Sequence, residues 1–219
     1  MNARDGFAYQ RAQMVAALRA GGIRDERVLA AMGEVPRHDF VPEAYRHQAY
    51  AEDVSINIGE GQTISQPRVV AMMIEAAGVG AQDRVLEIGT GSGYETAVLA
   101  SLCRFVFSAE RIPTLARAAK ARLDRLGVEN ASVKVMDGSL GWRSQAPFGA
   151  ILVTAAAPEL PEVLLEQLTD GGRLVVPVGR REAQILWVAE RRGGRARITE
   201  LREACFVPLI GRHGFGEGG

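Results

Sequence analysis

Residues 84–100 of the chain read RVLEIGTGSGYETAVLA. The mainly apolar run at 85–88 is typical of a strand that is covered on both faces of a sheet. Glycines then occupy every second position from Gly89 to Gly93, and glycine lets the backbone turn sharply and lets a ligand approach it closely. Helix-forming residues follow at 95–100, which places the free N–H groups of a helix start beside the turn. The stretch therefore predicts a buried strand, a ligand-binding turn and a helix.

Acidic residues near this turn indicate which ligand it binds. The spacing G-x-G-x-G differs from the G-x-G-x-x-G of dinucleotide sites, and Glu87 precedes the first glycine. A carboxylate there would oppose a pyrophosphate, but it suits S-adenosylmethionine, which carries an ammonium and a sulfonium and no phosphate. A second predicted strand at 105–109 leads into Glu110, which can accept hydrogen bonds from both hydroxyls of a ribose. Either acid alone could be a solvated loop charge, but together they favour a methyltransferase nucleotide site over an NAD site.

Composition narrows the remaining function classes. The 219 residues are 47% hydrophobic, which suffices for one large α/β domain. Lys+Arg and Asp+Glu both number 26, so we expect neither a nucleic-acid nor a membrane partner. Cys103 and Cys205 lack C-x-x-C spacing, which argues against disulfides and a metal site and fits a reducing cytoplasm. We also expect no signal peptide and no membrane-spanning segment.

The rest of the chain predicts how the site is assembled. Strands alternate with helices after residue 80, which favours a doubly wound, mainly parallel sheet of about seven strands with ligands at the carboxyl ends of its strands. The further predicted strands are 133–136, 148–153, 173–178 and a hairpin of 184–190 with 199–207, and the predicted helices between them are 114–126 and 161–168. Four polar residues fall at strand ends: Glu87, Glu110, Asp137 and Thr154. Asp137 could bind an adenine amino group or be an ordinary turn aspartate.

The first 80 residues predict added helices. Helical spacing over 5–31 is broken at Gly21-Gly22, and 54–58 alternates like a short edge strand. His38 and His47 have no ligand-like partners in sequence and are expected to be structural or surface residues. Ser65 is a natural N-cap for a helix with Pro67 in its first turn. A free hydroxyl at a helix start also suits a carboxylate ligand, although the local pattern favours the capping role.

Several segments resemble one known family, the protein-L-isoaspartate O-methyltransferases. The similarity covers most of the chain from about residue 5 to 214, and TIS-x-P is its most specific motif. The segments are GQTISQP at 61–67, VLEIGTGSGY at 85–94, VTAAAPELP at 153–161, GGRLVVPVG at 171–179 and FVPLIGRHG at 206–214.

The resemblance implies a fold, a cofactor and a substrate. The fold is an α/β methyltransferase of Rossmann-like type, a single domain in which 1–80 form a helical extension and cover and 81–219 form the core. The methyl donor is S-adenosylmethionine, its product is S-adenosylhomocysteine, and the substrates are isoaspartyl-containing proteins and peptides. Nothing in the chain requires an oligomer, so we expect a cytoplasmic monomer.

The resemblance also assigns site residues. Ser65 is the implied active-site residue, and Ser65, Gln66 and Arg68 are expected to contact the substrate. Arg68 departs from the histidine or tyrosine of many relatives, so it could reach the substrate carboxylate or point to solvent; Glu60 departs similarly. The expected cofactor contacts are Gln62, Thr63, Ile64, Glu87, Gly89, Thr90, Gly91, Ser92, Gly93, Glu110, Arg111, Asp137, Gly138 and Thr154.

Three other functions compete with this one. A related enzyme could methylate aspartate in one dedicated modified peptide. A nitrogen methyltransferase would usually carry an Asn/Asp-Pro-Pro-aromatic motif after the fourth strand, where this chain has TAAAP at 154–158. A regulator that binds the cofactor without turnover would not need both Ser65 and the full glycine loop.

Overall fold

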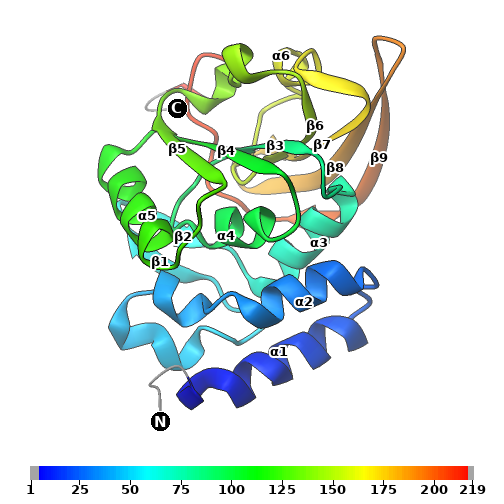
Figure 1. The fold of residues 1–219 in the computed structure, drawn as a ribbon. Coiled ribbons are helices and arrows are strands. Elements are labelled where there is room, and N and C mark those ends of the chain that lie inside the picture. Colours follow the sequence, from blue (N-terminus) through cyan, green and yellow to red (C-terminus); the bar gives the residue numbers. More distant parts are fainter. Residues whose placement is uncertain (1–4, 217–219) are drawn as a thin grey trace.

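The computed structural model describes residues 5–216 and is built around a seven-stranded sheet (Figure 1). The strand order is β5-β4-β3-β6-β7-β8-β9. Neighbours from β5 to β7 are parallel, and β8 and β9 add an antiparallel hairpin at one edge. This confirms the predicted doubly wound, mainly parallel sheet. The strands are β3 Arg84–Ile88, β4 Phe105–Glu110, β5 Ala131–Val135, β6 Phe148–Val153, β7 Leu168–Arg180, β8 Ala183–Arg192 and β9 Arg195–Ala204.

Helices cover the sheet unequally. Figure 1 shows α1 and α2 stacked beneath α3 and α4, so the N-terminal part of the chain extends one side of the molecule. A small separate sheet is formed by β1 Ile56–Gly59 and β2 Gln62–Ile64. The helices are α1 Ala8–Ala20, α2 Glu26–Glu34, α3 Pro67–Ala77, α4 Tyr94–Ala100, α5 Pro113–Arg125 and α6 Glu162–Leu165.

Alternate side chains of the central strands pack into two separate hydrophobic cores, one on each face of the sheet. Val85 and Val106 pack into a large cluster with the first four helices, whereas Leu86 and Phe107 pack on the opposite face with α6 and the chain's C-terminal segment. Because successive strand side chains point to opposite faces, a strand buried on both sides must be apolar nearly throughout. A polar residue in such a strand, like Glu87, therefore lies beneath a helix.

Several predicted elements differ from the structure, including the strand predicted at 173–178, which as β7 begins already at Leu168. The strand expected at 54–58 is not an edge of the main sheet: β1 pairs with β2, because the chain reverses at Glu60 and Gly61, both with positive φ. The predicted 161–168 helix is only α6, because the chain turns back and Leu168 pairs with Phe148. In the predicted hairpin, β8 runs longer than 184–190, and β9 spans 195–204 instead of 199–207, because the two strands meet at a two-glycine turn, Gly193-Gly194, with φ of 55° and 79°.

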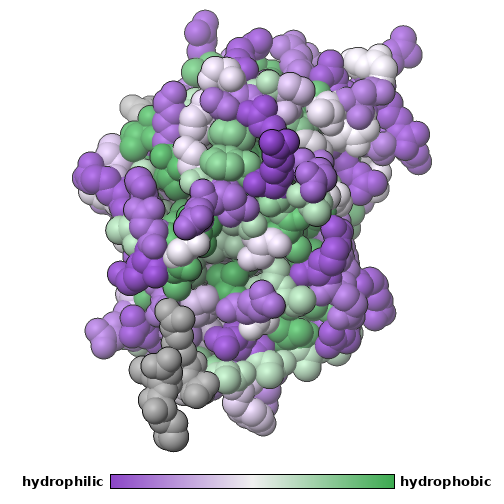
Figure 2. Space-filling model, viewed as in Figure 1, coloured by the Kyte–Doolittle hydropathy of each residue, from purple (hydrophilic) through white to green (hydrophobic). Residues whose placement is uncertain are grey.

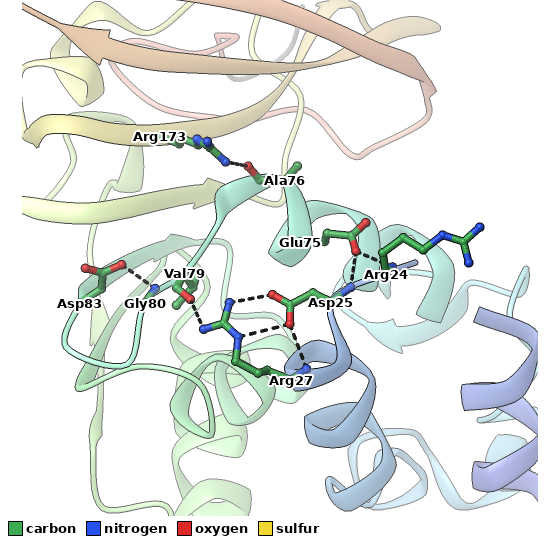
Figure 3. A network of polar contacts seen from close by, with 9 residues as sticks. All are labelled: Arg24, Asp25, Arg27, Glu75, Ala76, Val79, Gly80, Asp83 and Arg173. Atoms are coloured by element: carbon green, nitrogen blue, oxygen red, sulfur yellow. Dashed lines mark hydrogen bonds and ion pairs between the residues drawn. The ribbon is translucent and has the colours of Figure 1, made fainter. Parts of the chain in front are cut away.

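A polar clamp fixes the N-terminal helices to the core (Figure 3). Glu75 of α3 accepts hydrogen bonds from the backbone N–H groups of Arg24 and Asp25, both at 2.6 Å. Asp25 in turn caps α2, and the Arg27 side chain donates to the Val79 carbonyl at 3.1 Å. The start of α2 is thus held against the end of α3, the helix that begins next to Ser65.

The surface in the view of Figure 2 is mostly hydrophilic, with apolar residues showing between the charged ones. Across residues 5–216, no helix combines the length and the apolar character that crossing a membrane requires.

Candidate active site

A pocket opens at the carboxyl ends of β3 and β4, where parallel α/β sheets bind their ligands. Strand β2 covers it from one side, and the C-terminal segment 207–210 closes it from another. Most of the predicted cofactor residues line this pocket; the exceptions are Glu87, Gly93 and Asp137. Those that line it are Gln62, Thr63, Ile64, Gly89, Thr90, Gly91, Ser92, Glu110, Arg111, Gly138 and Thr154.

The glycine loop has the conformation that its sequence predicts. Gly89, Gly91 and Gly93 have φ of 98°, 52° and 89°, in the region that L side chains rarely adopt. A Cβ on Gly89 would also overlap the hydroxyl of Thr154, which donates to the Gly89 carbonyl at 2.8 Å. The loop therefore exposes bare backbone to the pocket, with the start of α4 directly behind it.

Glu110 occupies the position expected of a ribose-binding acid. Its two carboxylate oxygens accept hydrogen bonds from the backbone N–H groups of Gly91 and Ile112, each at 2.9 Å. These bonds fix the carboxylate at the pocket wall, and each oxygen keeps a second lone pair for a ligand hydroxyl. The glycine loop and the acid are thus locked to one another.

Glu87 was predicted to contact the cofactor, but its side chain lies beneath the glycine loop and not at the pocket wall. It is fully buried and does not line the pocket; Thr96 of α4 and Ser108 of β4 both donate to its Oε2. The strand alternation turns this side chain toward α4, beneath the loop, rather than out of the strand end. Burial is the main cause that raises its pKa to about 7.

Asp137 likewise does not line the cofactor pocket; its carboxylate is hydrogen-bonded within the protein. Its carboxylate accepts hydrogen bonds from the Ser139 hydroxyl at 2.7 Å and from the backbone N–H of Arg212 at 2.9 Å. Burial alone would raise its pKa, but the bonds from Arg212 and Ser139 outweigh it and the pKa is lowered. Asp137 thus ties the C-terminal segment to the end of β5, beside Gly138, which does line the pocket.

Ser65 is not a helix cap, and that prediction is wrong. The residue preceding α3 is Gln66, and no side chain hydrogen-bonds to the helix start. Pro67 holds Gln66 in an extended conformation, with ψ of 139°, which moves Ser65 one residue away from the free N–H groups. Among the residues described, none forms a hydrogen bond with the Ser65 hydroxyl, which lines the pocket.

A buried arginine holds the Ser65 backbone in place. Arg37 is completely buried and donates to the carbonyls of Ala49, at 2.7 Å, and Ser65, at 2.6 Å. Its guanidinium also lies over the ring of Tyr94, 4.6 Å from the centroid. Burial lowers the pKa of Arg37 to about 10, so it remains charged at neutral pH.

A groove continues from the pocket toward the antiparallel edge of the sheet. Thr63, Ser65 and Thr154 line both hollows, so Ser65 lies at their junction. Gln66 and Arg68 line the groove but not the cofactor pocket. Arg68 neither reaches the pocket nor points freely to solvent, because it forms an ion pair with Glu52 at 2.8 Å.

The family model of protein-L-isoaspartate(D-aspartate) O-methyltransferases matches residues 9–214. The chain belongs to this family. Its relatives include protein-L-isoaspartate O-methyltransferases of Magnetococcus marinus, 51% identical over 94% of this chain and 90% of theirs, and of Methanoculleus marisnigri, 54% identical over 90% of each chain.

Solved structures agree with this membership. A protein-L-isoaspartate O-methyltransferase superposes with a TM-score of 0.82 at 31% identity, covering 93% of this chain and 67% of that one. A Plasmodium falciparum protein assigned to the same activity superposes with a TM-score of 0.79 at 25% identity, covering 91% of this chain and 98% of that one. The latter was solved in complex with S-adenosyl-L-homocysteine.

The pocket of this family member fits an S-adenosyl cofactor. A Cβ at Gly89 would overlap the Thr154 hydroxyl, and one at Gly138 would lie 2.6 Å from Ile88, so both positions require glycine where the backbone borders the pocket. Glu110 offers free lone pairs at the pocket wall, and buried Glu95 brings a carboxylate oxygen without a hydrogen-bond partner. Acidic side chains at the pocket wall suit a ligand that carries cationic groups. No described group of His, Cys, Asp and Glu is arranged to hold a metal ion.

Sequence reasoning missed several residues of the site. Tyr94 and Glu95 line the pocket although they follow the glycine loop and were assigned to the helix. Segment 207–210 was expected to be strand or tail, but it runs beside Ala156, exchanging hydrogen bonds through Val207 and Leu209 at 2.8 Å. Arg37 gave no signal in the sequence, because its partners are distant backbone carbonyls.

Proposed function

We propose that this protein transfers the methyl group of S-adenosylmethionine to the side-branched α-carboxylate of L-isoaspartyl residues in proteins and peptides. The observation that carries the proposal is the position of Ser65. Its hydroxyl has no bonding partner in the described part of the chain, and it lies where the cofactor pocket meets the groove. A donor at that junction can hold a carboxylate that enters from the groove.

Named residues would hold the cofactor in this proposal. Glu110 would accept from the ribose hydroxyls, the loop from Gly89 to Gly93 would contact the methionyl part, and β2 would cover the molecule. When bound, S-adenosylmethionine supplies a methyl group on a positively charged sulfur that leaves as a neutral thioether. Binding of S-adenosyl-L-homocysteine by a neighbouring structure of this family supports the assignment.

The residues of the chain would act by positioning rather than by proton transfer. The acceptor carboxylate is already ionised at neutral pH, so no general base is needed. The Ser65 hydroxyl would donate to the carboxylate oxygen that does not attack, which turns the other oxygen toward the methyl group. Such positioning is worth roughly 7–11 kcal/mol in favourable cases. Arg37 would act indirectly, by fixing the Ser65 carbonyl.

The product would lead to repair. An ester on this carboxylate closes to a succinimide when the neighbouring backbone nitrogen attacks it and methanol leaves. Hydrolysis of the succinimide returns part of the chain to a normal aspartyl linkage. We propose that damaged proteins in general are the substrates, that the enzyme is a cytoplasmic monomer, and that residues 1–80 cover the site while 81–219 form the core of one domain.

Methyl transfer to two matched peptides tests the proposal. One peptide carries L-isoaspartate at a single position and the other carries L-aspartate there, and both are incubated with the enzyme and labelled S-adenosylmethionine. We expect label in the isoaspartyl peptide alone. Label in the aspartyl peptide, or in neither, would overturn the proposed substrate and favour a dedicated peptide partner.

A further inference from the structure

Glu95 at the cofactor pocket and its buried neighbour Glu87 have no basic partner among the described residues. Glu95, in the first turn of α4, is 6% exposed and lines the pocket, yet its Oε1 forms no hydrogen bond within the described residues. Glu87 is 0% exposed, and its Oε1 is likewise unpartnered because both of its donors bond to Oε2. Leaving a buried carboxylate oxygen unsatisfied is costly, so a native protein that keeps one usually uses it.

The surroundings of this pair are negative rather than positive. Glu110 on β4 adds a third carboxylate on the same side of the loop, and it is occupied by backbone N–H groups. The buried Arg37 donates to two carbonyls and lies over the Tyr94 ring; its Nη1 has no partner among the described residues, but it forms no ion pair with either glutamate. Arg111, which also lines the pocket, is exposed.

Burial and mutual repulsion keep a proton on the pair. Burial and then the charge of Glu87 raise the pKa of Glu95 well above its ordinary value, and burial raises that of Glu87 to about 7. Two like charges that interact in a dry environment do not ionise together. Near neutral pH the pocket therefore holds a carboxyl that a cation could ionise.

We propose that Glu95 is the anionic partner of the positively charged methionyl end of S-adenosylmethionine, and that it gives up a proton when that end binds. This inference rests on the proposed use of the cofactor but not on the identity of the methyl acceptor. The cation is the ammonium, which the donor and the demethylated product share, or the sulfonium, which the donor alone carries. A sulfonium partner would make Glu95 distinguish the donor from its product.

The proposal has two consequences for binding. A proton should leave the protein as the cofactor enters, because the bound cation stabilises the ionised carboxylate. Affinity should therefore increase as the pH rises below the range of about 7.7–8.0 in which an α-amino group itself loses its proton, since fewer protons then compete with the cation.

Calorimetry on the full chain tests the first consequence without any substitution. S-adenosylmethionine is titrated into wild-type protein in phosphate and in Tris at one pH, because the two buffers have different enthalpies of ionisation. A difference in apparent binding enthalpy that corresponds to proton uptake by the buffer supports the proposal. Equal enthalpies, together with a Kd that does not change between about pH 6 and 7, where the ligand's amino group stays protonated, would overturn it.

The substitution Glu95→Gln tests whether Glu95 itself is the partner of the cation, and Glu129→Gln, at an exposed position, is the matched control. The glutamine keeps the shape but not the charge, so we expect the variant to bind S-adenosylmethionine about 10- to 100-fold more weakly and to release less than half of the wild-type proton. Equal weakening of S-adenosylhomocysteine binding identifies the ammonium as the partner, and weakening confined to the donor identifies the sulfonium. Affinity and proton release like those of the control would overturn the proposal, and the wild-type titration decides alone if the variant does not fold.

Discussion

At the scale of single residues, the site depends on which polar side chains are hydrogen-bonded within the protein and which are not. Ser65 is free because Pro67 displaces it from the helix start, whereas Glu87 is committed because its strand turns it under α4. A polar side chain is thus free to bind a ligand, or is already hydrogen-bonded within the protein, according to the direction in which the backbone points it.

Replacing Ser65 by alanine should lower kcat/KM by about tenfold, because one hydrogen bond to a charged group is worth about 1–2 kcal/mol. Binding of S-adenosylhomocysteine should not change, since the loop and Glu110 would hold the cofactor. Steady-state kinetics with the isoaspartyl peptide and calorimetry with the product analogue measure both. Ser144→Ala, at an exposed position, is the control; a variant at Ser65 as active as this control would contradict the assigned role.

Replacing Arg37 by methionine should lower the free energy of unfolding by about 2–4 kcal/mol, because the carbonyls of Ala49 and Ser65 would lose their donor inside the core. Urea denaturation measures the loss, with the exposed Arg117→Met as its counterpart. Activity should also fall at temperatures where the variant is fully folded, since Ser65 would no longer be fixed. If folded variant and wild type had equal kcat, Arg37 would be structural only.

At the scale of elements, the pocket is closed by segments that are distant in sequence. The C-terminal segment reaches the pocket because it is attached in two places, through Ala156 beyond the end of β6 and through Asp137 beyond the end of β5. The β1–β2 hairpin reaches it from the other side, and Glu60 fastens that hairpin to Thr114 of α5 at 2.7 Å. The cover of the site is therefore fixed by these polar bonds together with apolar packing, since Ile64 and Leu209 belong to the two cores.

The attachment at Asp137 gives a pH-dependent prediction. Asp137→Asn should lower the free energy of unfolding by about 1–2 kcal/mol at pH 7, since an amide nitrogen cannot accept from the Arg212 N–H. The pKa of Asp137 is lowered in the folded protein, so its contribution is present above the ordinary aspartate pKa of about 3.9 and is lost as the pH falls through the folded value.

Chemical denaturation of wild type and variant at several pH values measures this difference. It should be constant from about pH 7 to 5 and should shrink below about pH 4. Asp53→Asn, at an exposed position, serves as the reference. A difference that persists unchanged at acid pH would show that the lost bonds do not involve the ionised carboxylate.

At the scale of the whole molecule, the ligand pocket is lined by segments that are far apart in the sequence. Residues from β2, the glycine loop, β4 and the C-terminal segment all line it. Ligand binding should therefore stabilise the whole chain: S-adenosylhomocysteine at 100 times its Kd should add about 2.7 kcal/mol and raise Tm by about 5–10 °C. Thermal unfolding followed by circular dichroism measures the shift, and NAD at equal concentration should produce none. A comparable shift with NAD would contradict the assignment of the pocket.

The sequence alone determined the architecture and most of the pocket wall. Apolar runs and glycine spacing are local signals, and they state directly where strands end and where the backbone must turn, so the sheet, the loop and the place of Glu110 could be read from them. The motifs around Ser65 and the glycine loop likewise indicated the family.

Only the tertiary structure decided which polar side chains face the ligand. Whether Glu87 or Glu95 borders the pocket depends on strand alternation and on how α4 packs over β3, and neither is encoded by the residue type. The same holds for Arg37 and Arg68, whose partners lie 28 and 16 residues away in sequence. Periodicity describes one element at a time, whereas hydrogen bonding and burial depend on the elements that pack against it, so these assignments required the folded molecule.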